Sequence, residues 1–221
     1  MFTPSRLTTA EHLDDAGADG ASALRSLRDL RGINRWFGGT FAYRSLVRRI
    51  TPRRDITLLD IGTGTSDLLA SIDAETKIGS DIKLDHLAYG AALDPGARVI
   101  RVVASAMSLP FRDGSVDVVT SSHFFHHFSA EENVRILREC LRVARIGVGA
   151  SDTRRHWVPL LFVRAIAATP LWGTITKHDA PASVQQGYTI GEAAAIARKV
   201  GASRWNVVRQ IAFRFGVLLW K

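Results

Sequence analysis

The sequence predicts an α/β fold built on a doubly wound sheet of seven strands, mostly parallel with an antiparallel last strand. Short apolar runs alternate with amphipathic helical stretches between residues 56 and 150, which is the pattern of βαβ units and a parallel sheet. A glycine-containing turn follows the first run. The last two runs, 205–209 and 211–220, are joined by almost no loop, and so tight a connection forces antiparallel pairing.

Residues 1–52 are predicted to form an N-terminal helical extension or cap. Residues 1–22 are polar and weakly periodic, so we expect them to be loosely attached. Apolar residues recur at helical spacing over 22–37, and Gly38 and Gly39 end that helix. A second helix is expected over 41–50, ended by Pro52.

Residues 53–221 are predicted to form a single domain with an apolar cap insertion at about 153–188. The insertion starts with an apolar stretch, 157–172, that Pro159 and Pro170 interrupt, and continues with an expected polar loop at 177–181. The remaining strands are predicted at 56–61, 77–81, 98–104, 116–121 and 144–150, with helices at 84–93, 130–143 and 190–200.

The amino-acid composition limits the classes of protein to which this chain can belong. A chain of 221 residues with 46% hydrophobic and 23% charged residues suits one folded domain. Its single cysteine supports neither a disulfide framework nor a thiolate metal cluster. An apolar run of membrane-spanning length and a secretory signal pattern are both lacking in the sequence. We therefore expect a cytoplasmic protein.

The net charge of +8 favours nucleic acid, an anionic membrane surface or an acidic substrate. The arginines are spread along the chain without a dense tract, and the sign of the charge alone specifies no partner. We expect a small-molecule acceptor rather than nucleic acid, with peripheral membrane or lipid contact left open. The oligomeric state is not predicted.

The turn DIGTGTS at residues 60–66 lies where doubly wound sheets bind nucleotides. A dinucleotide fingerprint needs glycine or alanine where Asp67 stands, and a carboxylate beside a helix N-terminus repels pyrophosphate. Asp60 ends the first strand, and Asp81 ends the second, where an acid accepts from ribose hydroxyls. Carboxylates suit S-adenosylmethionine, which carries an ammonium and a sulfonium but no phosphate.

With these residues the chain resembles the class I S-adenosylmethionine-dependent methyltransferases over about residues 56–221. LLDIGTGT at 58–65 is similar to the family's first motif, with Ser66 in place of a third glycine. LPFRDGSVDVV at 109–119 is similar to a segment of the branch that methylates quinones and other small molecules. The resemblance implies a Rossmann-like sheet with a reversed last strand. The cofactor residues it implies are Asp60, Gly62, Thr63, Gly64, Asp67, Asp81, Ile82, Ser105, Ala106, Met107 and Ser121.

The chain departs from the family at the adenine contact. Ser105 and Ala106 stand where members often have Asp-Ala, so a hydroxyl or backbone group is expected to replace the acid. More narrowly, SLRDLRGINR at 26–35, DTRR at 152–155 and KHDAPASV at 177–184 resemble a bacterial subgroup often encoded beside type III polyketide synthases. That likeness implies a lipophilic phenol or pyrone acceptor.

The chemistry predicts where the catalytic groups lie. Methyl transfer mainly requires alignment and exclusion of water, and a histidine assists a hydroxyl acceptor at neutral pH. His126 is the first candidate as base or acceptor orienter, and His123 is the second. His127, Arg154, Arg155 and Trp157 are the candidate acceptor contacts.

A metal is not expected, because the His-x-x-His-His run has neither an evident carboxylate partner nor the helical spacing of zincins. A serine nucleophile is not expected either, since a G-x-S-x-G elbow is lacking. Two other hypotheses stay open: a nucleic-acid (RNA) methyltransferase, and a non-enzymatic module that kept the fold and the cofactor. The methylated atom, oxygen, carbon or nitrogen, is not predicted.

Overall fold

A computed structural model describes residues 3–8, 11–14 and 20–221. Its seven-stranded sheet has the order β3-β2-β1-β4-β5-β7-β6. Strands β1 to β5 pair in parallel, and β7 runs antiparallel between β5 and β6. The predicted fold class, including the reversed last strand, is confirmed. The strands are β1 Thr57–Ile61, β2 Thr76–Asp81, β3 Ile100–Val103, β4 Val116–Ser122, β5 Ala144–Thr153, β6 Arg204–Gln210 and β7 Arg214–Trp220.

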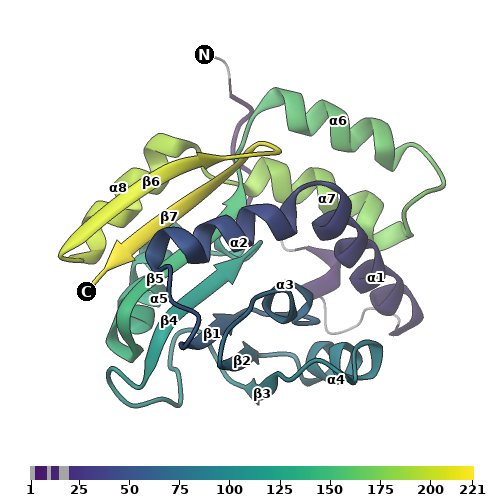
Figure 1. Ribbon diagram of the computed structural model, residues 1–221. Coiled ribbons are helices and arrows are strands. Elements are labelled where there is room, and N and C mark those ends of the chain that lie inside the picture. The colour runs from purple at the N-terminus through teal and green to yellow at the C-terminus, as the bar shows by residue number, and fades with distance from the viewer. Residues whose placement is uncertain (1–2, 9–10, 15–19) are drawn as a thin grey trace.

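Helices cover both faces of the sheet (Figure 1). Figure 1 shows α2 and α3 in front of the sheet and α5 and α8 behind it, while α1, α6 and α7 gather beyond the carboxyl ends of the parallel strands. The helices are α1 Gly20–Trp36, α2 Gly39–Ile50, α3 Asp67–Ala70, α4 Leu84–Leu93, α5 Ala130–Val143, α6 Trp157–Ala167, α7 Thr174–Gln186 and α8 Ile190–Val200, with short 3-10 helices η1 His12–Asp14 and η2 Phe125–His127.

Strand β1 is buried on both faces, as its continuous apolar run predicts. Leu58 packs with α2 in one core cluster, whereas Leu59 and Ile61 pack in the other, which contains residues of α5 and α8. Alternate side chains of a strand point to opposite faces. Both clusters therefore meet along β1 and hold the turn that follows it.

Gly38 separates α1 from α2, as predicted. Its φ of 75° lies in the left-handed region, which glycine adopts readily. The chain then re-enters a helix at once, and α2 packs its buried face, including Tyr43, against the sheet. The segment before residue 53 thus contributes to the core.

The expected polar loop at 177–181 is wrong, because these residues belong to α7, with Pro181 inside the helix. Proline removes one backbone donor and is unfavourable in a helix interior. Burial of Ala182 and Val184 supports the helix. The buried Asp179 supports it too, because its carboxylate accepts hydrogen bonds from backbone N–H groups of η1. Tertiary contacts outweigh local propensity here.

The N-terminal segment, defined as the described residues 3–8 and 11–14, is docked rather than loosely attached. The Arg6 guanidinium donates to the carbonyl oxygens of Gln186 and Phe128, at 2.8 and 2.9 Å, and lies over the ring of Tyr188. Glu11 is buried. The expectation of loose attachment is therefore wrong for this segment, while residues 1–2, 9–10 and 15–19 lie outside the described chain. Among the described helices, none combines the length and apolar character needed to cross a membrane.

Candidate active site

A cavity of about 510 Å³ opens at the carboxyl ends of β1, β2 and β4. This is the edge where doubly wound sheets bind ligands. Its floor is the turn after β1, and the end of β2 and the segments 104–107 and 122–128 form its walls. Leu27, Leu30 and Asn34 of α1 close one side, and Glu11 and Leu13 of the N-terminal segment also line it.

Nearly all predicted cofactor residues line this cavity. They are Asp60, Gly62, Thr63, Gly64, Asp67, Asp81, Ile82, Ser105, Ala106 and Met107. The exception is Ser121, which is buried in β4 opposite Ile61, while its neighbour Ser122 lines the cavity. The structure thus brings the predicted set together, and the binding roles of its members stay predictions.

The turn after β1 depends on glycine at two positions. Gly62 and Gly64 have φ values of 60° and 54°, in the left-handed region. A Cβ atom on Gly62 would lie 2.2 Å from Cδ2 of Phe124, whereas a Cβ on Gly64 would meet open space. Gly62 therefore allows Phe124 to close over the turn.

Asp60 lies buried at the bottom of the cavity. Its Oδ1 accepts hydrogen bonds from the hydroxyls of Tyr43 and Thr120, at 2.8 and 2.9 Å. Burial raises the pKa of Asp60 to about 6, although these bonds oppose the rise. A bound cation would favour the ionised form. Sequence reasoning missed Tyr43, because the amphipathic pattern of its helix marks it only as a core residue.

Asp81 ties the turn to the end of β2. Its Oδ2 accepts from the backbone N–H of Gly64 at 2.8 Å, and its Oδ1 accepts from that of Lys83 at 2.9 Å. A carboxylate has about four acceptor positions, so further acceptor capacity remains. The exposed side chains of Ile82 and Met107 stand beside it as apolar walls. This donor and acceptor set fits a ligand with a diol and a cationic centre.

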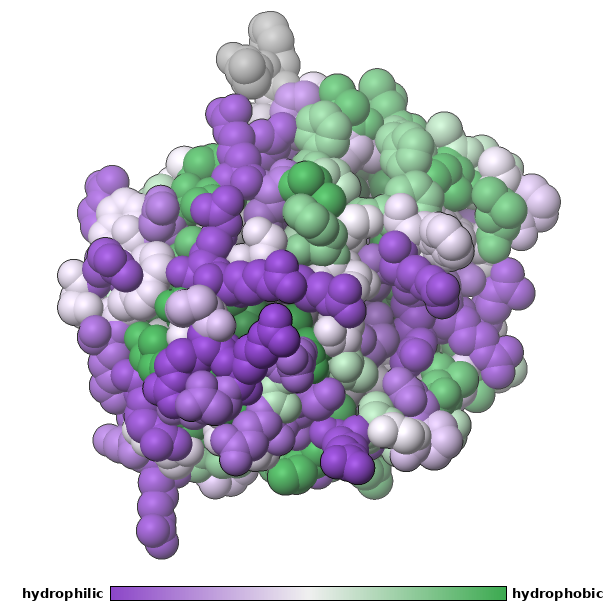
Figure 2. All heavy atoms as spheres, viewed as in Figure 1, coloured by the Kyte–Doolittle hydropathy of each residue, from purple (hydrophilic) through white to green (hydrophobic). Residues whose placement is uncertain are grey.

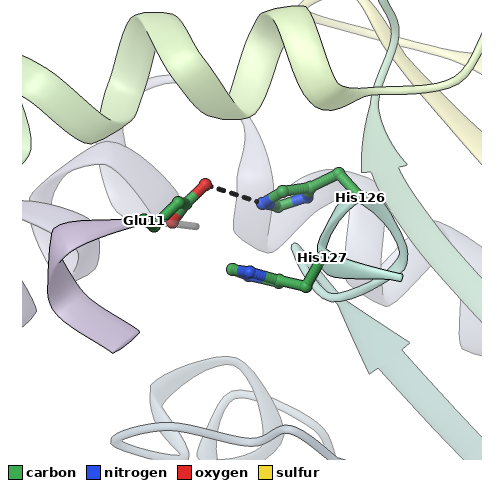
Figure 3. Close-up of side chains that lie close together, drawn as sticks. All are labelled: Glu11, His126 and His127. Carbon is green, nitrogen blue, oxygen red and sulfur yellow. Dashed lines mark hydrogen bonds and ion pairs between the residues drawn. The ribbon is translucent and has the colours of Figure 1, made fainter. Parts of the chain in front are cut away.

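His126 in η2 also lines the cavity and lies between two carboxylates, of which Figure 3 shows Glu11. Its Nδ1 lies 2.8 Å from Oδ1 of Asp152, and its Nε2 lies 3.2 Å from Oε1 of Glu11. Burial lowers the pKa of His126, but Asp152 and Glu11 outweigh burial and raise it to about 10. In this arrangement His126 keeps its proton at neutral pH. Its predicted role as base or acceptor orienter stays a prediction.

His123 lines the same cavity in the opposite protonation state. Burial and the nearby Arg214 guanidinium hold the pKa of its imidazole well below the ordinary value, so the ring is neutral. Its Nε2 accepts from Nη1 of Arg214. Two of the predicted histidines are therefore present with different roles, since one is charged and the other neutral. His127 follows them on the cavity wall.

Glu11 is the functional candidate that sequence reasoning missed. It comes from a polar N-terminal stretch and lies 115 positions from His126 along the chain. The neighbouring backbone holds it in place, because the N–H groups of His12 and Leu13 donate to the Asp179 carboxylate, both at 2.9 Å. Nζ of Lys83 donates to the carbonyl oxygen of Leu13 at 2.5 Å. A contact of this range leaves no local signal in a sequence.

Three of the predicted acceptor contacts lie away from the cavity lining. Arg155 is buried and donates to the carbonyl oxygens of Pro4 and Gly187 and to the Glu192 carboxylate. Arg155 thus has a structural role, and its predicted contact with the acceptor stays a prediction. Arg154 lies over the ring of Phe213, and Trp157 is half exposed at the start of α6. Of the four predicted contacts, only His127 lines the cavity.

Comparison with known proteins supports the assignment made from the residues. A family model described as "Methyltransferase domain" matches residues 59–148, which is under half of the chain. The demethylmenaquinone methyltransferase of Roseiflexus castenholzii is 31% identical over 132 residues, which cover 51% of this chain and 55% of that protein. The chain thus spans about half the length of the curated relatives it matches first.

Solved structures share the fold. A SAM-dependent methyltransferase from Aquifex aeolicus matches with a TM-score of 0.65 and 19% identity, over 89% of this chain and 97% of that one. PigF, solved with SAH, matches with a TM-score of 0.64 and 18% identity, over 88% and 59% of the two chains. The predicted Rossmann-like fold is confirmed, and the match to the methyltransferase domain model covers residues 59–148.

Proposed function

We propose that this chain is an S-adenosylmethionine-dependent methyltransferase that acts on a small, lipophilic phenol, pyrone or quinone-like acceptor. One observation carries the donor half of the proposal: Asp60 and Asp81, from the ends of neighbouring strands, reach one cavity beside a turn shaped by glycine. The matched methyltransferase domain covers this turn. The quinone-type acceptor is supported by the name of the relative from Roseiflexus castenholzii, a demethylmenaquinone methyltransferase.

Around Asp60 and Asp81, the cavity offers a suitable partner for each part of S-adenosylmethionine. The ribose hydroxyls donate to Asp81, whose oxygens keep free acceptor positions. Asp60 supplies negative charge for the cationic methionyl portion. The apolar side chains of Ile82 and Met107 border the place of the adenine ring, beside the backbone of Ser105.

The acceptor half of the cavity is apolar and partly covered. Leu13, Leu27, Leu30, Phe124 and Phe128 line it together with His123, His126 and His127. The N-terminal segment lies across this part, anchored to α7 and to Lys83. An enclosed apolar chamber suits a small ring system, whereas a nucleic-acid strand needs an open, positively charged groove.

In the proposed reaction an acceptor atom attacks the methyl carbon in line with the departing sulfur. The bond from sulfur to the methyl carbon breaks, the bond from the acceptor to the methyl carbon forms, and S-adenosylhomocysteine leaves. His126 acts as an orienting residue. It lies beside the acceptor, held in place by Asp152 and Glu11 at its two ring nitrogens, and the acceptor hydroxyl loses its proton to solvent. This role fits the raised pKa of His126 better than the role of base does.

We also propose that α6 contacts a membrane from which the lipophilic acceptor enters. Trp157, Val158, Leu161 and Phe162 are each at least 42% exposed on this helix. Phe162 meets Phe37 at the corner between α1 and α2, with ring centroids 5.7 Å apart. Figure 2 shows hydrophobic residues gathered on this face of the molecule, over the position of α6 in Figure 1. Patches of this kind mark interaction surfaces.

Two experiments test the proposed function. Calorimetry with S-adenosylmethionine, S-adenosylhomocysteine and a nicotinamide dinucleotide tests the donor, and binding of the dinucleotide alone would contradict a methyltransferase. Incubation with methyl-labelled cofactor and a host extract, followed by separation of lipid, nucleic acid and protein, tests the acceptor. We expect label in the lipid-soluble fraction. Label in RNA would favour the nucleic-acid hypothesis instead.

A further inference from the structure

The cavity wall holds two imidazoles and one carboxylate that face each other. Figure 3 shows Glu11 reaching toward His126 from the N-terminal segment, with the ring of His127 beside them. One ligand atom from each of the three residues lies within 4.8 Å of the others. We propose that Glu11, His126 and His127 bind a divalent first-row transition-metal ion. The metal site rests on these residues alone, whereas its role in catalysis rests on the proposed function.

The distance between two of the ligand atoms already suits a shared ion. Nε2 of His126 and Oε1 of Glu11 are 3.2 Å apart. For an ion about 2.1 Å from each atom, the angle between the two bonds at the ion is about 100°, which lies between the octahedral and tetrahedral values. These two side chains need little movement to become neighbouring ligands. His127 is the exposed member of the group, so its ring is at the cavity side.

Asp152 and Ser183 hydrogen-bond to the two buried ligands, as the neighbours of metal ligands commonly do. The Nδ1 atom of His126 pairs with the buried Asp152 carboxylate, which aims Nε2 at Glu11. A carboxylate behind a ligating imidazole fixes its orientation and makes it a stronger ligand. Behind Glu11, the hydroxyl of Ser183 donates to Oε1. Asp152 lies outside the cavity lining, whereas Ser183 lines the cavity beside Glu11.

Charge also favours a cation at this position. Two buried carboxylates, Glu11 and Asp152, flank the ring of His126, one at each ring nitrogen. The neighbouring His123 faces Arg214 instead. A divalent ion that displaces the proton from Nε2 of His126 balances both carboxylates, because His126 then becomes a neutral ligand.

The ligand set indicates the class of ion and its chemistry. Two histidines and one carboxylate suit zinc, iron, cobalt, nickel or manganese, whereas magnesium and calcium prefer oxygen ligands. Three protein ligands leave coordination positions open toward the cavity. An acceptor oxygen bound there is polarised by the ion and loses its proton to solvent more readily. The resulting anion is the form that attacks the methyl group.

A second cluster provides a matched control. His12, His178 and Asp179 also lie close enough to share an ion. Their imidazoles, however, stack face to face, with centroids 3.6 Å apart and planes at 3°, and the Asp179 carboxylate already caps the backbone of η1. Replacing His178 removes its stacking on His12 and one hydrogen bond to Asp179, but it removes none of the three proposed ligands.

The test uses the 221-residue chain, freed of metal by dialysis against a chelator. Cobalt(II) and zinc(II) are titrated by calorimetry, and the visible spectrum of bound cobalt reports its ligands. We expect one ion per chain. Glu11→Gln and His127→Gln should each weaken the affinity about tenfold or more. His178→Ala should leave affinity and spectrum unchanged.

Folding and cofactor binding are measured on every variant by circular dichroism and by titration with S-adenosylmethionine. Lack of cobalt and zinc uptake by the folded wild-type chain would overturn the metal site. Uptake that His178→Ala abolishes and Glu11→Gln retains would overturn it too. Cofactor binding without metal uptake contradicts the metal site and leaves the proposed function intact. Metal uptake without cofactor binding contradicts the proposed function and leaves the metal site intact.

Discussion

The substitution Asp60→Asn tests the electrostatic argument for the donor site, because two measured quantities should move in opposite directions. Burial raises the pKa of Asp60 from 3.8 to about 6. The unfolded chain therefore loses this proton first as the pH rises from about 4 to 6, and the folded protein loses stability in that window. At about 1.36 kcal/mol per pH unit, the loss is about 3 kcal/mol at neutral pH. Asparagine keeps an oxygen that accepts from Tyr43 and Thr120 and removes the charge.

Cofactor affinity should show the opposite dependence. With a pKa of about 6, Asp60 is about one-tenth ionised at pH 5 and about nine-tenths ionised at pH 7. If the cationic cofactor binds the ionised form, its affinity rises about tenfold between these pH values. Asp60→Asn, which resembles the protonated form, should bind at pH 7 no more tightly than the wild type does at pH 5, and its affinity should not change over this range.

Calorimetry with S-adenosylmethionine at pH 5, 6 and 7 measures the affinity, and urea unfolding without cofactor measures the stability. At pH 7 we expect the variant to bind S-adenosylmethionine more weakly than the wild type, and to be more stable than the wild type without cofactor. An equal tenfold pH dependence in wild type and variant would show that another group controls binding, and would refute the reasoning. A destabilised variant would refute the stability part alone.

Further substitutions test other parts of the site. Asp81→Ala should weaken cofactor binding roughly 100-fold, since two ribose hydroxyls lose a charged acceptor; calorimetry with an analogue lacking these hydroxyls should show no such loss. His126→Ala should slow turnover severely with near-normal cofactor affinity, and wild-type rates between pH 6 and 9 would remove His126 from the mechanism. Gly62→Ala should unfold at lower urea than Gly64→Ala, because both have positive φ but only the first added Cβ meets Phe124. Leu161→Asp on α6 should reduce co-sedimentation with phosphatidylglycerol vesicles, whereas Leu84→Asp, at an equally exposed leucine on α4, should not; equal loss in both would contradict the membrane surface.

The donor half of the site could be predicted because its determinants are local. Residues 60–66 form one turn, and Asp81 ends the next strand, so the order of strands in a doubly wound sheet places them together. The alternation of apolar runs likewise fixes which residues face the core. A sequence pattern is enough wherever neighbours in space are also close along the chain or lie at equivalent ends of paired strands.

The acceptor half was only partly predictable, since it depends on contacts between distant segments. The run His-x-x-His-His was recognised, but its carboxylate partners, Glu11 and Asp152, come from the N-terminal segment and from β5. Polar composition suggested that the N-terminal segment is loose. Its docking depends on Arg6 and on the buried Asp179, each of which is indistinguishable from a surface charge in the sequence. The helix over 177–181 was missed for the same reason.

This difference separates two kinds of specificity in one cavity. In the proposed function the two carboxylates for the cofactor, Asp60 and Asp81, belong to β1 and β2, so changes there disturb the sheet. The groups proposed for the acceptor come from residues 11–13, α1 and η2, which lie outside the strands. Leu27 and Leu30 of α1 can therefore vary in size without breaking a strand. Acceptor choice can change through these positions while the affinity for the cofactor is kept.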